Sequence, residues 1–347
     1  MEECPFVSVT VPVLNRENDI GRCLNSLLAL DYPSFEVIVV DNGSTDKTQE
    51  IVSRYPVKMV VEQKGGAYAA RNTGTEFARG EIIAFTDSDC VADRDWLKNL
   101  VRNYTDEKVG GVGGHLLPYK PSNTVEEFLS FGRLGIFHSS ETVAIHKEAK
   151  RFLSGALGSA NMSYRRNVLR EVKGFWEVAV FCGDYDLCWR VQSAGYEVVY
   201  EPKAIVCHRL RSSLPELVKQ FFLFGKCQPL LLKKQPGGFS YIKIKTYLFP
   251  SYEFRCKLPI QMLVTLDLCN LFMLSLILIS VRPFFLYLCL VVLVVVLWGA
   301  WRSAKGVVKE TKKMKWFLLF PLLHIIRNYS FIIGRIIGGL KHRIIAI

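Results

Sequence analysis

The chain contains ten cysteines but no Cys-x-x-Cys pair, the spacing that many structural zinc sites and dithiol redox sites share. We therefore interpret the cysteines mainly as small hydrophobic residues of a reduced protein. The sequence of 347 residues also lacks internal repeats and low-complexity tracts, which argues against repeat architectures. We also expect no signal peptide, because the acidic start runs straight into an expected strand. We expect the first 240 residues to lie in the cytosol.

Acidic residues are scarce in the last third of the chain. Between residues 241 and 347 only Glu253, Asp267 and Glu310 are acidic, against 15 lysines and arginines. The formal net charge of +12 therefore belongs to this part of the chain. A basic excess beside apolar runs is typical of the anionic cytoplasmic face of a membrane, where each basic residue contributes about 1 kcal/mol. The sequence thus predicts a membrane partner and no nucleic-acid partner.

Long apolar runs are confined to the C-terminal part of a chain that is 50% hydrophobic overall. Two runs, 258–280 and 284–301, each approach the roughly 20 residues with which a helix crosses a bilayer. Because only a short Val-Arg-Pro link separates them, we expect a transmembrane hairpin that returns to its starting side. The positive-inside rule then predicts that the basic loop at 302–315 is cytoplasmic.

Two further C-terminal segments are amphipathic. Residues 212–257 mix aromatic and aliphatic residues with lysines, which is typical of helices lying on a membrane surface. The segment 316–340 is long enough to span a bilayer but contains His324, Arg327 and Arg335. It is either a third crossing or a helix lying along the interface. Together these segments predict an integral protein of the cytoplasmic membrane.

The first 90 residues alternate between strand-like and helix-like patterns. Helices are expected to begin near residues 20, 47 and 67, between strands at 7–13, 37–40, 57–61 and 82–85. Four such units predict an α/β fold with a doubly wound, largely parallel sheet. Ligands of such sheets bind beyond the carboxyl ends of the strands. This edge is expected to gather Asn15, Asp41, Lys64, Asp87 and Asp89.

The fourth expected strand runs directly into Thr86-Asp87-Ser88-Asp89. Two carboxylates this close repel each other, so the pair is best explained by a cation that neutralises both. Hard carboxylate oxygens are the ligands that Mg²⁺ and Mn²⁺ prefer. For an isolated Asp-x-Asp, a polar turn after a strand is the competing interpretation. The order of the remaining motifs decides between the two.

Between residues 7 and 211 the chain resembles inverting glycosyltransferases of family 2, which have the Rossmann-like GT-A fold. The resemblance implies a catalytic domain at 1–211, followed by the membrane-interface and transmembrane segments. Each motif is weak alone, but the ordered set is specific. The motifs are Val11-Pro12-Val13-Leu14-Asn15, Asp41-Asn42-Gly43-Ser44-Thr45-Asp46, Gly66-Ala67-Tyr68-Ala69-Ala70-Arg71-Asn72, Asp87-Ser88-Asp89, Ser159-Ala160-Asn161-Met162, Gly174-Phe175 and Asp184-Tyr185-Asp186-Leu187.

By this resemblance Asp41 accepts hydrogen bonds from the donor base, although a turn-stabilising aspartate is the alternative. Pro12 and Asn15 belong to the same donor-nucleotide site. Arg71 would reach a phosphate or the ribose, and a surface helical arginine is as good an interpretation. Lys64 is a weaker donor-site candidate, because a lysine beside glycines is usually just solvated.

The resemblance also implies how the diphosphate is held. Asp89 would ligate a Mn²⁺ or Mg²⁺ ion that bridges the donor phosphates, and Asp87 would contact the ribose or the metal indirectly. The cation stabilises the negative charge that develops on the leaving nucleoside diphosphate. His208 follows an apolar strand and could complete the metal site, or it could be a structural histidine.

Asp184 is the candidate general base, which would take the proton of the acceptor hydroxyl as it attacks with inversion. The chain departs from the family's usual Glu-Asp pair, since Gly183 replaces the glutamate, and this leaves Asp186 as a second candidate. The alternative for Asp186 is an ion pair with Arg190 at i, i+4 spacing. Asp186 and Trp176 are also candidates for the acceptor side, although Trp176 is as readily a core residue.

The family's Gln-x-x-Arg-Trp signature of processive synthases is absent. We therefore expect transfer of a single sugar from a nucleotide-diphosphate donor to a lipid-linked or saccharide acceptor at the cytoplasmic membrane face. One alternative is a polyprenyl-phosphate monoglycosyltransferase, whose acceptor is a phosphate. A second alternative is a non-catalytic nucleotide-sugar-binding membrane scaffold, to which the glycine at 183 points.

Overall fold

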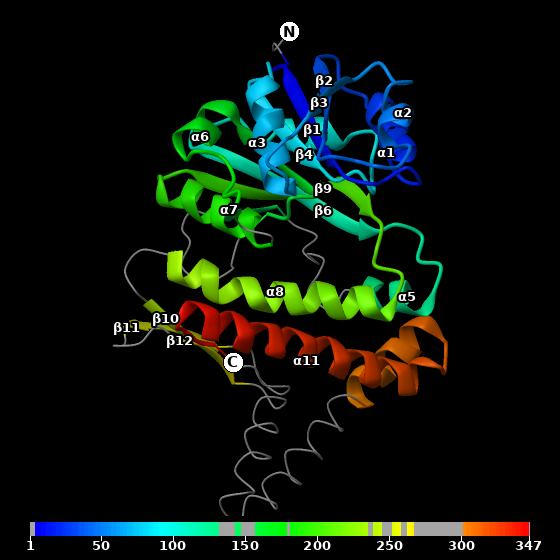
Figure 1. Ribbon diagram of the computed structural model, residues 1–347, viewed down its shortest axis with the longest axis vertical. Coiled ribbons are helices and arrows are strands. Elements are labelled where there is room, and N and C mark those ends of the chain that lie inside the picture. Colours follow the sequence, from blue (N-terminus) through cyan, green and yellow to red (C-terminus); the bar gives the residue numbers. More distant parts are fainter. Residues whose placement is uncertain are drawn as a thin grey trace, which may run out of the picture. The chain divides into compact units, whose positions relative to one another are not determined.

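The computed structural model describes residues 4–131, 143–146, 157–178, 181–234, 239–244, 252–257, 262–266 and 301–346 (Figure 1). The chain divides into two units, Met1–Leu210 and Arg211–Ile347, which are described separately below. Nearly all of the expected transmembrane hairpin at 258–301 lies outside the described residues, so the hairpin stays a prediction.

The first unit is built on one mixed sheet in the order β3-β2-β1-β4-β8-β6-β9-β5, with β7 paired to β9. Its first four strands in this order are parallel, as the alternation of strands and helices predicts. β8 then pairs antiparallel with both β4 and β6. The strands are β1 (Val7–Val13), β2 (Phe35–Asp41), β3 (Lys58–Val61), β4 (Ile82–Thr86), β5 (Cys90–Ala92), β6 (Val109–Pro118), β7 (Ala144–His146), β8 (Asn161–Arg165) and β9 (Glu197–His208).

Alternate residues of the central strands enter two separate cores. Val37 and Val39 of β2 face one cluster, while Ile38 and Val40 face the other. Successive side chains of a strand point to opposite faces, so a strand buried on both sides is apolar at every position. This explains why residues 37–40 of β2 and 82–85 of β4 are continuous apolar runs in the sequence.

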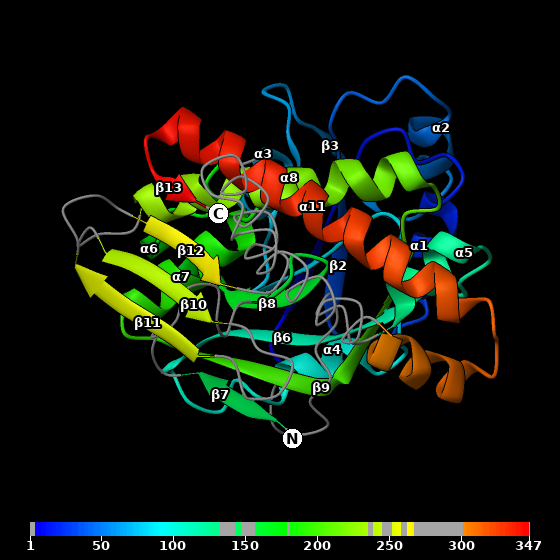
Figure 2. The same ribbon diagram turned by 90° about the horizontal axis from the view of Figure 1, so that it is seen from below.

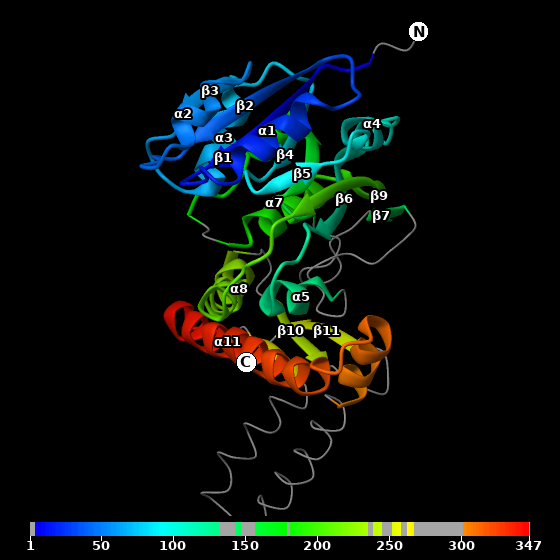
Figure 3. The ribbon, with the colours of Figure 1, turned by 90° about the vertical axis from the view of Figure 1, so that its right-hand side faces the viewer.

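Helices cover both faces of this sheet (Figures 1 and 3). Helices α1 and α4 contribute to the first core, whereas α3, α6 and α7 contribute to the second. The helices of the first unit are α1 (Ile20–Leu28), α2 (Thr48–Val52), α3 (Ala67–Phe77), α4 (Trp96–Val101), α5 (Thr124–Ser130), α6 (Arg166–Glu171) and α7 (Gly183–Ser193). The loops at the carboxyl ends of β1, β2 and β4 are therefore fixed between two packed layers.

The second unit contains two long helices, α8 (Leu214–Lys234) and α11 (Trp316–His342), shown from below in Figure 2. Residues 301–311 are also helical. Of the helices in the described residues, α11 alone is long enough and apolar enough to cross a membrane. A small sheet has the order β11-β10-β12-β13, with strands β10 (Phe239–Ile244), β11 (Tyr252–Lys257), β12 (Met262–Leu266) and β13 (Ile345–Ala346).

The secondary structure of this unit differs from the sequence prediction at two places. Within the segment 212–257, α8 is helical as expected, but β10 and β11 are strands. β12 lies inside the range 258–280, for which the sequence predicts a membrane helix. Short apolar runs that are rich in β-branched and aromatic residues do not distinguish strand from helix by periodicity, which explains both differences.

Candidate active site

The two aspartates of the Asp-Ser-Asp motif lie in a tight turn between β4 and β5. The backbone N–H of Cys90 donates to the carbonyl of Asp87 at 3.0 Å, which closes the turn. Thr86, the last residue of β4, donates its hydroxyl to the carbonyl of Ala160 at 3.0 Å. Because β5 pairs antiparallel with β9, Cys90 lies opposite His208. Sheet pairing alone therefore brings a histidine distant in sequence to the aspartate pair.

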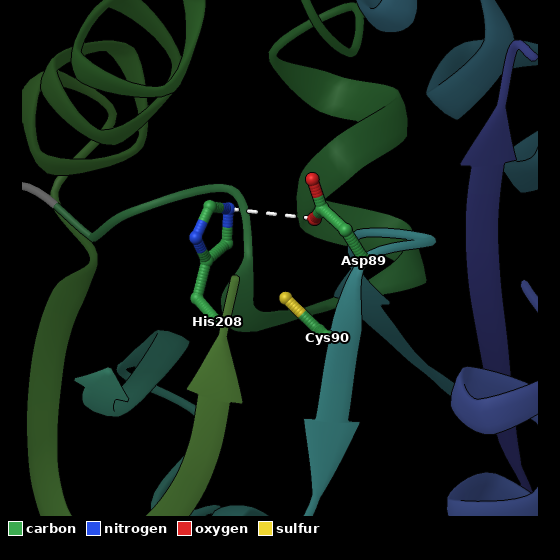
Figure 4. A group of neighbouring side chains, drawn as sticks. All are labelled: Asp89, Cys90 and His208. Atoms are coloured by element: carbon green, nitrogen blue, oxygen red, sulfur yellow. Dashed lines mark ion pairs between the residues drawn. The ribbon is translucent and has the colours of Figure 1, made fainter. Parts of the chain in front are cut away.

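Asp89 and His208 face each other across this strand pair (Figure 4). The imidazole Nε2 lies 3.5 Å from Oδ1 of Asp89 and 3.9 Å from Oδ2 of Asp87. On its other oxygen, Asp89 is 3.4 Å from Nη2 of Arg16. Oδ1 of Asp89 is buried and has no hydrogen-bond partner among the described residues. A buried carboxylate oxygen with an unfilled lone pair is suited to a cation.

The chemistry of these side chains fits a hard divalent ion. Ligand atoms of Asp89, Cys90 and His208 all lie within 4.8 Å of one another. Burial raises the pKa of the Cys90 thiol well above its ordinary value, and the charges of Asp89 and Asp87 raise it further. Cys90 is thus a protonated thiol, which is a poor ligand for Mg²⁺ or Mn²⁺. The residues that would hold the ion are Asp89 and His208, with Asp87 beside them.

Arg71 is buried rather than on the helix surface, with a relative exposure of 3%. Its guanidinium forms an ion pair with Asp87 and donates to the carbonyl of Ala67 at 3.2 Å. The rings of Tyr68 and Phe175 lie beside it, with centroids 5.5 and 5.9 Å from Cζ. The surface interpretation of Arg71 is therefore wrong, and its direct partner is the first aspartate of the motif.

Asn15 joins the loop after β1 to the loop after β2, and Asp41 stabilises the second of these loops from within. Asn15 has a φ of +51° and accepts the N–H of Thr45 at 2.8 Å. The fully buried Asp41 accepts the N–H of Ser44 at 3.1 Å and the amide of Gln49 at 2.7 Å. The turn-stabilising role of Asp41 is thus present in the structure. Its contact with a donor base stays a prediction, as does that of Pro12.

Lys64 lies in the loop between β3 and α3 and is exposed. Its ammonium is 3.5 Å from the carboxylate of Glu177. An exposed pair of this kind contributes little to stability, so the lysine is free to exchange this partner for a substrate.

Asp184 lies at the start of α7 and points toward the end of the loop before β8. Its Oδ2 accepts the N–H of Ser159 at 3.3 Å, and its Oδ1 accepts the N–H of Tyr185 at 2.9 Å. Burial raises the pKa of the Asp184 carboxyl above its ordinary value, against the opposing effect of these two N–H groups and of Arg71. Ser159 precedes Ala160, whose carbonyl accepts the hydroxyl of Thr86, so Asp184 and the aspartate pair are linked through the end of the loop before β8.

Asp186 has a different environment from Asp184. It is buried to 2% exposure and its Oδ2 lies 2.8 Å from Nη2 of Arg190, which confirms the ion pair expected from their i, i+4 spacing. Because this carboxylate is covered, an acceptor could not reach it. The alternative assignments of Asp186 as general base or acceptor contact therefore do not fit the structure. Trp176 packs partly buried against the second core, as a core residue would.

The glycine that replaces the family's glutamate has a specific neighbour in this chain. The N–H of Gly183 donates to the hydroxyl of Tyr68 at 3.0 Å. A Cβ added at Gly183 would lie only 2.6 Å from the Tyr68 ring, which is itself stacked on Phe175. Tyr68 therefore occupies the space of a side chain at 183. The hydrogen bond also satisfies one of the free N–H groups at the start of α7.

We expect Gly183→Ala to destabilise the chain by about 1–3 kcal/mol, because the Tyr68 ring is packed on both sides and cannot yield without strain. Gly158→Ala is the matched control, since its Cβ would meet its nearest neighbour, Leu116, at an ordinary 3.5 Å. Urea unfolding of both variants measures the difference. Equal urea midpoints for the two variants would show that the Tyr68 ring moves aside without cost.

Sequence reasoning missed a group of charged residues around the aspartate pair. Asp19, which is 4% exposed, binds Arg22 at 2.7 Å and Arg209 at 2.8 Å through the same oxygen. The backbone N–H of Arg209 also donates to the carbonyl of Asp89 at 3.2 Å. The only signal in the sequence was the position of Arg209 directly after His208. Arg16 brings its guanidinium to Asp89 itself, whereas the guanidinium groups of Arg22 and Arg209 pair with Asp19 beside the motif.

Comparison with known proteins identifies the family. Residues 8–173 match the family model for glycosyl transferase family 2. Glycosyltransferase AglE of Haloferax volcanii is 34% identical over 234 residues, which cover 65% of this chain and 73% of AglE. The chain belongs to glycosyltransferase family 2. It is therefore an enzyme that transfers a sugar from a nucleotide sugar, as its motifs predict.

Other family 2 relatives are longer than the shared region. The pre-mycofactocin glycosyltransferase of Mycobacterium tuberculosis is 31% identical over 235 residues, but the match spans only 48% of that protein. The chain thus covers most of AglE and about half of this second relative.

Solved structures share the fold of the family 2 domain. The mannosyltransferase PcManGT from Pyrobaculum calidifontis, in complex with GDP-Man and Mn²⁺, superposes with a TM-score of 0.51 at 23% identity, covering 66% of this chain and 64% of PcManGT. S. aureus TarS 1-349 in complex with UDP-GlcNAc gives a TM-score of 0.50 at 22% identity, covering 67% of this chain and 68% of TarS. The expected GT-A-like α/β fold is confirmed.

Proposed function

We propose that this enzyme transfers one sugar, with inversion, from a nucleotide-diphosphate donor to a hydroxyl group of a lipid-linked or saccharide acceptor at the cytoplasmic membrane face. The observation that carries the proposal is the meeting of Asp89, His208 and Arg16 at the turn between β4 and β5. Asp184, at the start of α7, is close enough to Arg71 to feel its charge, and Arg71 is itself the ion-pair partner of Asp87. Such a cluster joins a cation site, positive charge and a carboxylate with a raised pKa in one place.

Asp89 and His208 would hold a Mn²⁺ or Mg²⁺ ion, with Asp87 beside them. When bound, the ion neutralises negative charge on the diphosphate leaving group. Arg16 adds positive charge beside Asp89, while the backbone N–H of Arg209 binds the carbonyl of Asp89 and its guanidinium is held by Asp19. Arg71 holds Asp87 in place through their ion pair, so that the first carboxylate does not turn away from the donor.

Asp184 acts on the acceptor side in this proposal. Its carboxylate takes the proton of the acceptor hydroxyl while that oxygen attacks the anomeric carbon from the face opposite the diphosphate. Burial raises its pKa, which makes it a stronger base than an ordinary aspartate. The N–H of Ser159 fixes one of its oxygens, leaving lone pairs for the incoming hydroxyl.

The names of relatives support this donor and acceptor class. PcManGT is described with GDP-Man and Mn²⁺, and TarS with UDP-GlcNAc. A Methanococcus voltae relative, 23% identical over 263 residues, is named as a glucuronosyltransferase acting on dolichyl N-acetyl-glucosaminyl phosphate. That acceptor is a lipid-linked sugar, whose reacting group is a hydroxyl rather than a phosphate. We therefore favour a hydroxyl acceptor over a polyprenyl phosphate.

A thermal-shift screen of nucleotide sugars tests the donor site. We expect one donor to raise the melting temperature with Mn²⁺ and not with EDTA, because a ligand at 100 times its Kd stabilises the folded state by about 2.7 kcal/mol. The same donor should then be consumed when a lipid extract or a saccharide acceptor is added. Stabilisation without turnover across all acceptors would instead support the non-catalytic scaffold.

A further inference from the structure

Helix α11 exposes apolar side chains near both of its ends, and these side chains form a stripe on one face. The exposed positions recur with the period of an α-helix, so they share one face over about 33 Å. No charged residue of α11 lies among them. The exposed members are Leu318, Leu322, Ile333, Ile336, Ile337 and Leu340.

The opposite side of α11 packs on α8 and contains polar groups. A Cβ at Gly225 of α8 would collide with the backbone of Phe331, and one at Gly334 of α11 with that of Phe222, so the two helices touch backbone to backbone. Arg335 is buried here and donates to the side chain of Gln228 at 2.6 and 2.9 Å. The buried Arg335 of α11 thus faces α8, while the exposed apolar side chains of the stripe face away from it.

The register of the two helices determines what a membrane crossing would require. Phe222 and Lys226 meet Gly334 and Gly338, so the helices run in the same direction. Glu216 and Lys219, which lie earlier in α8 and are exposed, are therefore level with the middle of α11. If α11 spanned a bilayer, these two charges would be carried to its centre, where charged side chains are strongly disfavoured.

Both ends of α11 are basic. Lys312, Lys313 and Lys315 precede the helix, while Lys341 and Arg343 lie at its C-terminal end. A spanning helix would leave one of these clusters on the far side of the membrane, against the positive-inside rule. Positive charge at both ends matches one anionic surface that runs along the helix.

We propose that α8 and α11 form a flat, interfacial anchor, with the stripe of α11 inserted among the acyl chains and both basic ends on anionic headgroups of one leaflet. The occupant of the apolar face is then a lipid bilayer, and α11 does not cross it. This assignment concerns the second unit alone and is independent of the donor chemistry proposed above.

Cysteine labelling tests the proposal, with the number of labels counted on each molecule. Lys313→Cys and Lys341→Cys are combined in the full chain, with its native cysteines replaced, and reconstituted into vesicles containing phosphatidylglycerol. A membrane-impermeant maleimide is added outside. We expect each chain to carry either two labels or none, whatever its orientation, because both sites lie on one side. One label on every chain would show that α11 spans the bilayer and would overturn the proposal.

Labelling after detergent solubilisation, which should reach both cysteines, checks that the variant is competent. Trypsin added outside vesicles of the unmodified chain gives the same comparison without substitutions, since the sites after Lys315 and Lys341 should be cut together or not at all. One cut per chain would contradict the proposal.

Nitroxide labels at Leu322 and Leu340 identify what covers the stripe. Both should be relaxed by oxygen dissolved in the lipid and shielded from an aqueous nickel chelate, at equal depth. A label at the exposed Lys219 of α8 is the matched control and should respond to the chelate. Shielding of Leu322 and Leu340 from both reagents would show that a second copy of the chain covers the stripe, which would also overturn the proposal.

Discussion

Asp89→Asn is expected to lower sugar transfer by roughly 10³-fold, since cation stabilisation of a leaving group is worth several kcal/mol and each 1.4 kcal/mol is about tenfold in rate. The amide is neutral and binds a hard cation poorly, while it keeps the shape of the carboxylate. The contact of Asp89 with Arg209 uses the backbone carbonyl, which the substitution leaves in place. Initial rates of product formation at saturating donor and Mn²⁺ measure the loss.

Asp95→Asn provides the matched control for this substitution. Asp95 is exposed at the start of α4, where its only ion pair is a 3.8 Å contact with Lys98 among the described residues. Its removal should leave the rate within about twofold, because exposed pairs contribute little. If the Asp89 variant retained most of its activity, the aspartate pair would not hold the reacting diphosphate.

Asp184→Asn is expected to lower kcat by about 10²–10⁴-fold, the usual contribution of a general base. Donor affinity should be unchanged, because in our proposal Asp184 contacts the acceptor and not the nucleotide. Rapid-quench measurement of a single turnover, together with donor titration, separates these two quantities. A phosphate acceptor needs no base, so substantial residual activity would favour the polyprenyl-phosphate alternative.

The pH dependence of the same carboxylate gives an independent check. Burial raises the pKa of Asp184, so the reactive, deprotonated form is gained as the pH rises through that raised value. Activity should therefore fall on the acidic side at a pH above the ordinary range of an aspartate. The Asp184→Asn variant should lose this acidic limb.

The raised pKa of Asp184 should make folding stability fall with rising pH, whereas activity should rise. A carboxyl group with a raised pKa in the folded state favours folding while it is protonated, and this contribution is lost as the pH rises through the folded value. At neutral pH the variant should thus be at least as stable as the natural chain, as thermal unfolding would show. A variant that unfolds readily would mean that Asp184 is a structural residue.

The parallel half of the sheet was predictable because each of its strands carries its own signal. The runs at 37–40 and 82–85 are apolar at every position, since their side chains enter cores on both faces, and the run at 7–13 has valine at every second position. The antiparallel position of β8 between β4 and β6 was not predictable. It depends on pairing between segments about 50 to 80 residues apart, which leaves no local pattern.

The candidate site, too, was predictable from the sequence only in part. The motif order placed Asp87, Asp89, His208 and Asp184, and the structure brings the first three into contact. The pairing of Arg71 with Asp87 and of Arg16 with Asp89 could not be read from sequence, since an arginine's partner is decided by the fold. From the sequence, the glycine at 183 points to the non-catalytic alternative. The structure gives it a packing reason, because the ring of Tyr68 occupies the space of a side chain at this position.

The central claim is that the Asp-Ser-Asp turn and His208 bind a cation together with a nucleoside diphosphate. Calorimetric titration of the natural chain and of Asp89→Asn with UDP and GDP, each in Mn²⁺ and in EDTA, tests it most directly. We predict that one diphosphate binds the natural chain in Mn²⁺, at least tenfold more weakly in EDTA, and that Asp89→Asn loses this difference. Equal binding in Mn²⁺ and EDTA, or an undiminished metal effect in Asp89→Asn, would contradict the account.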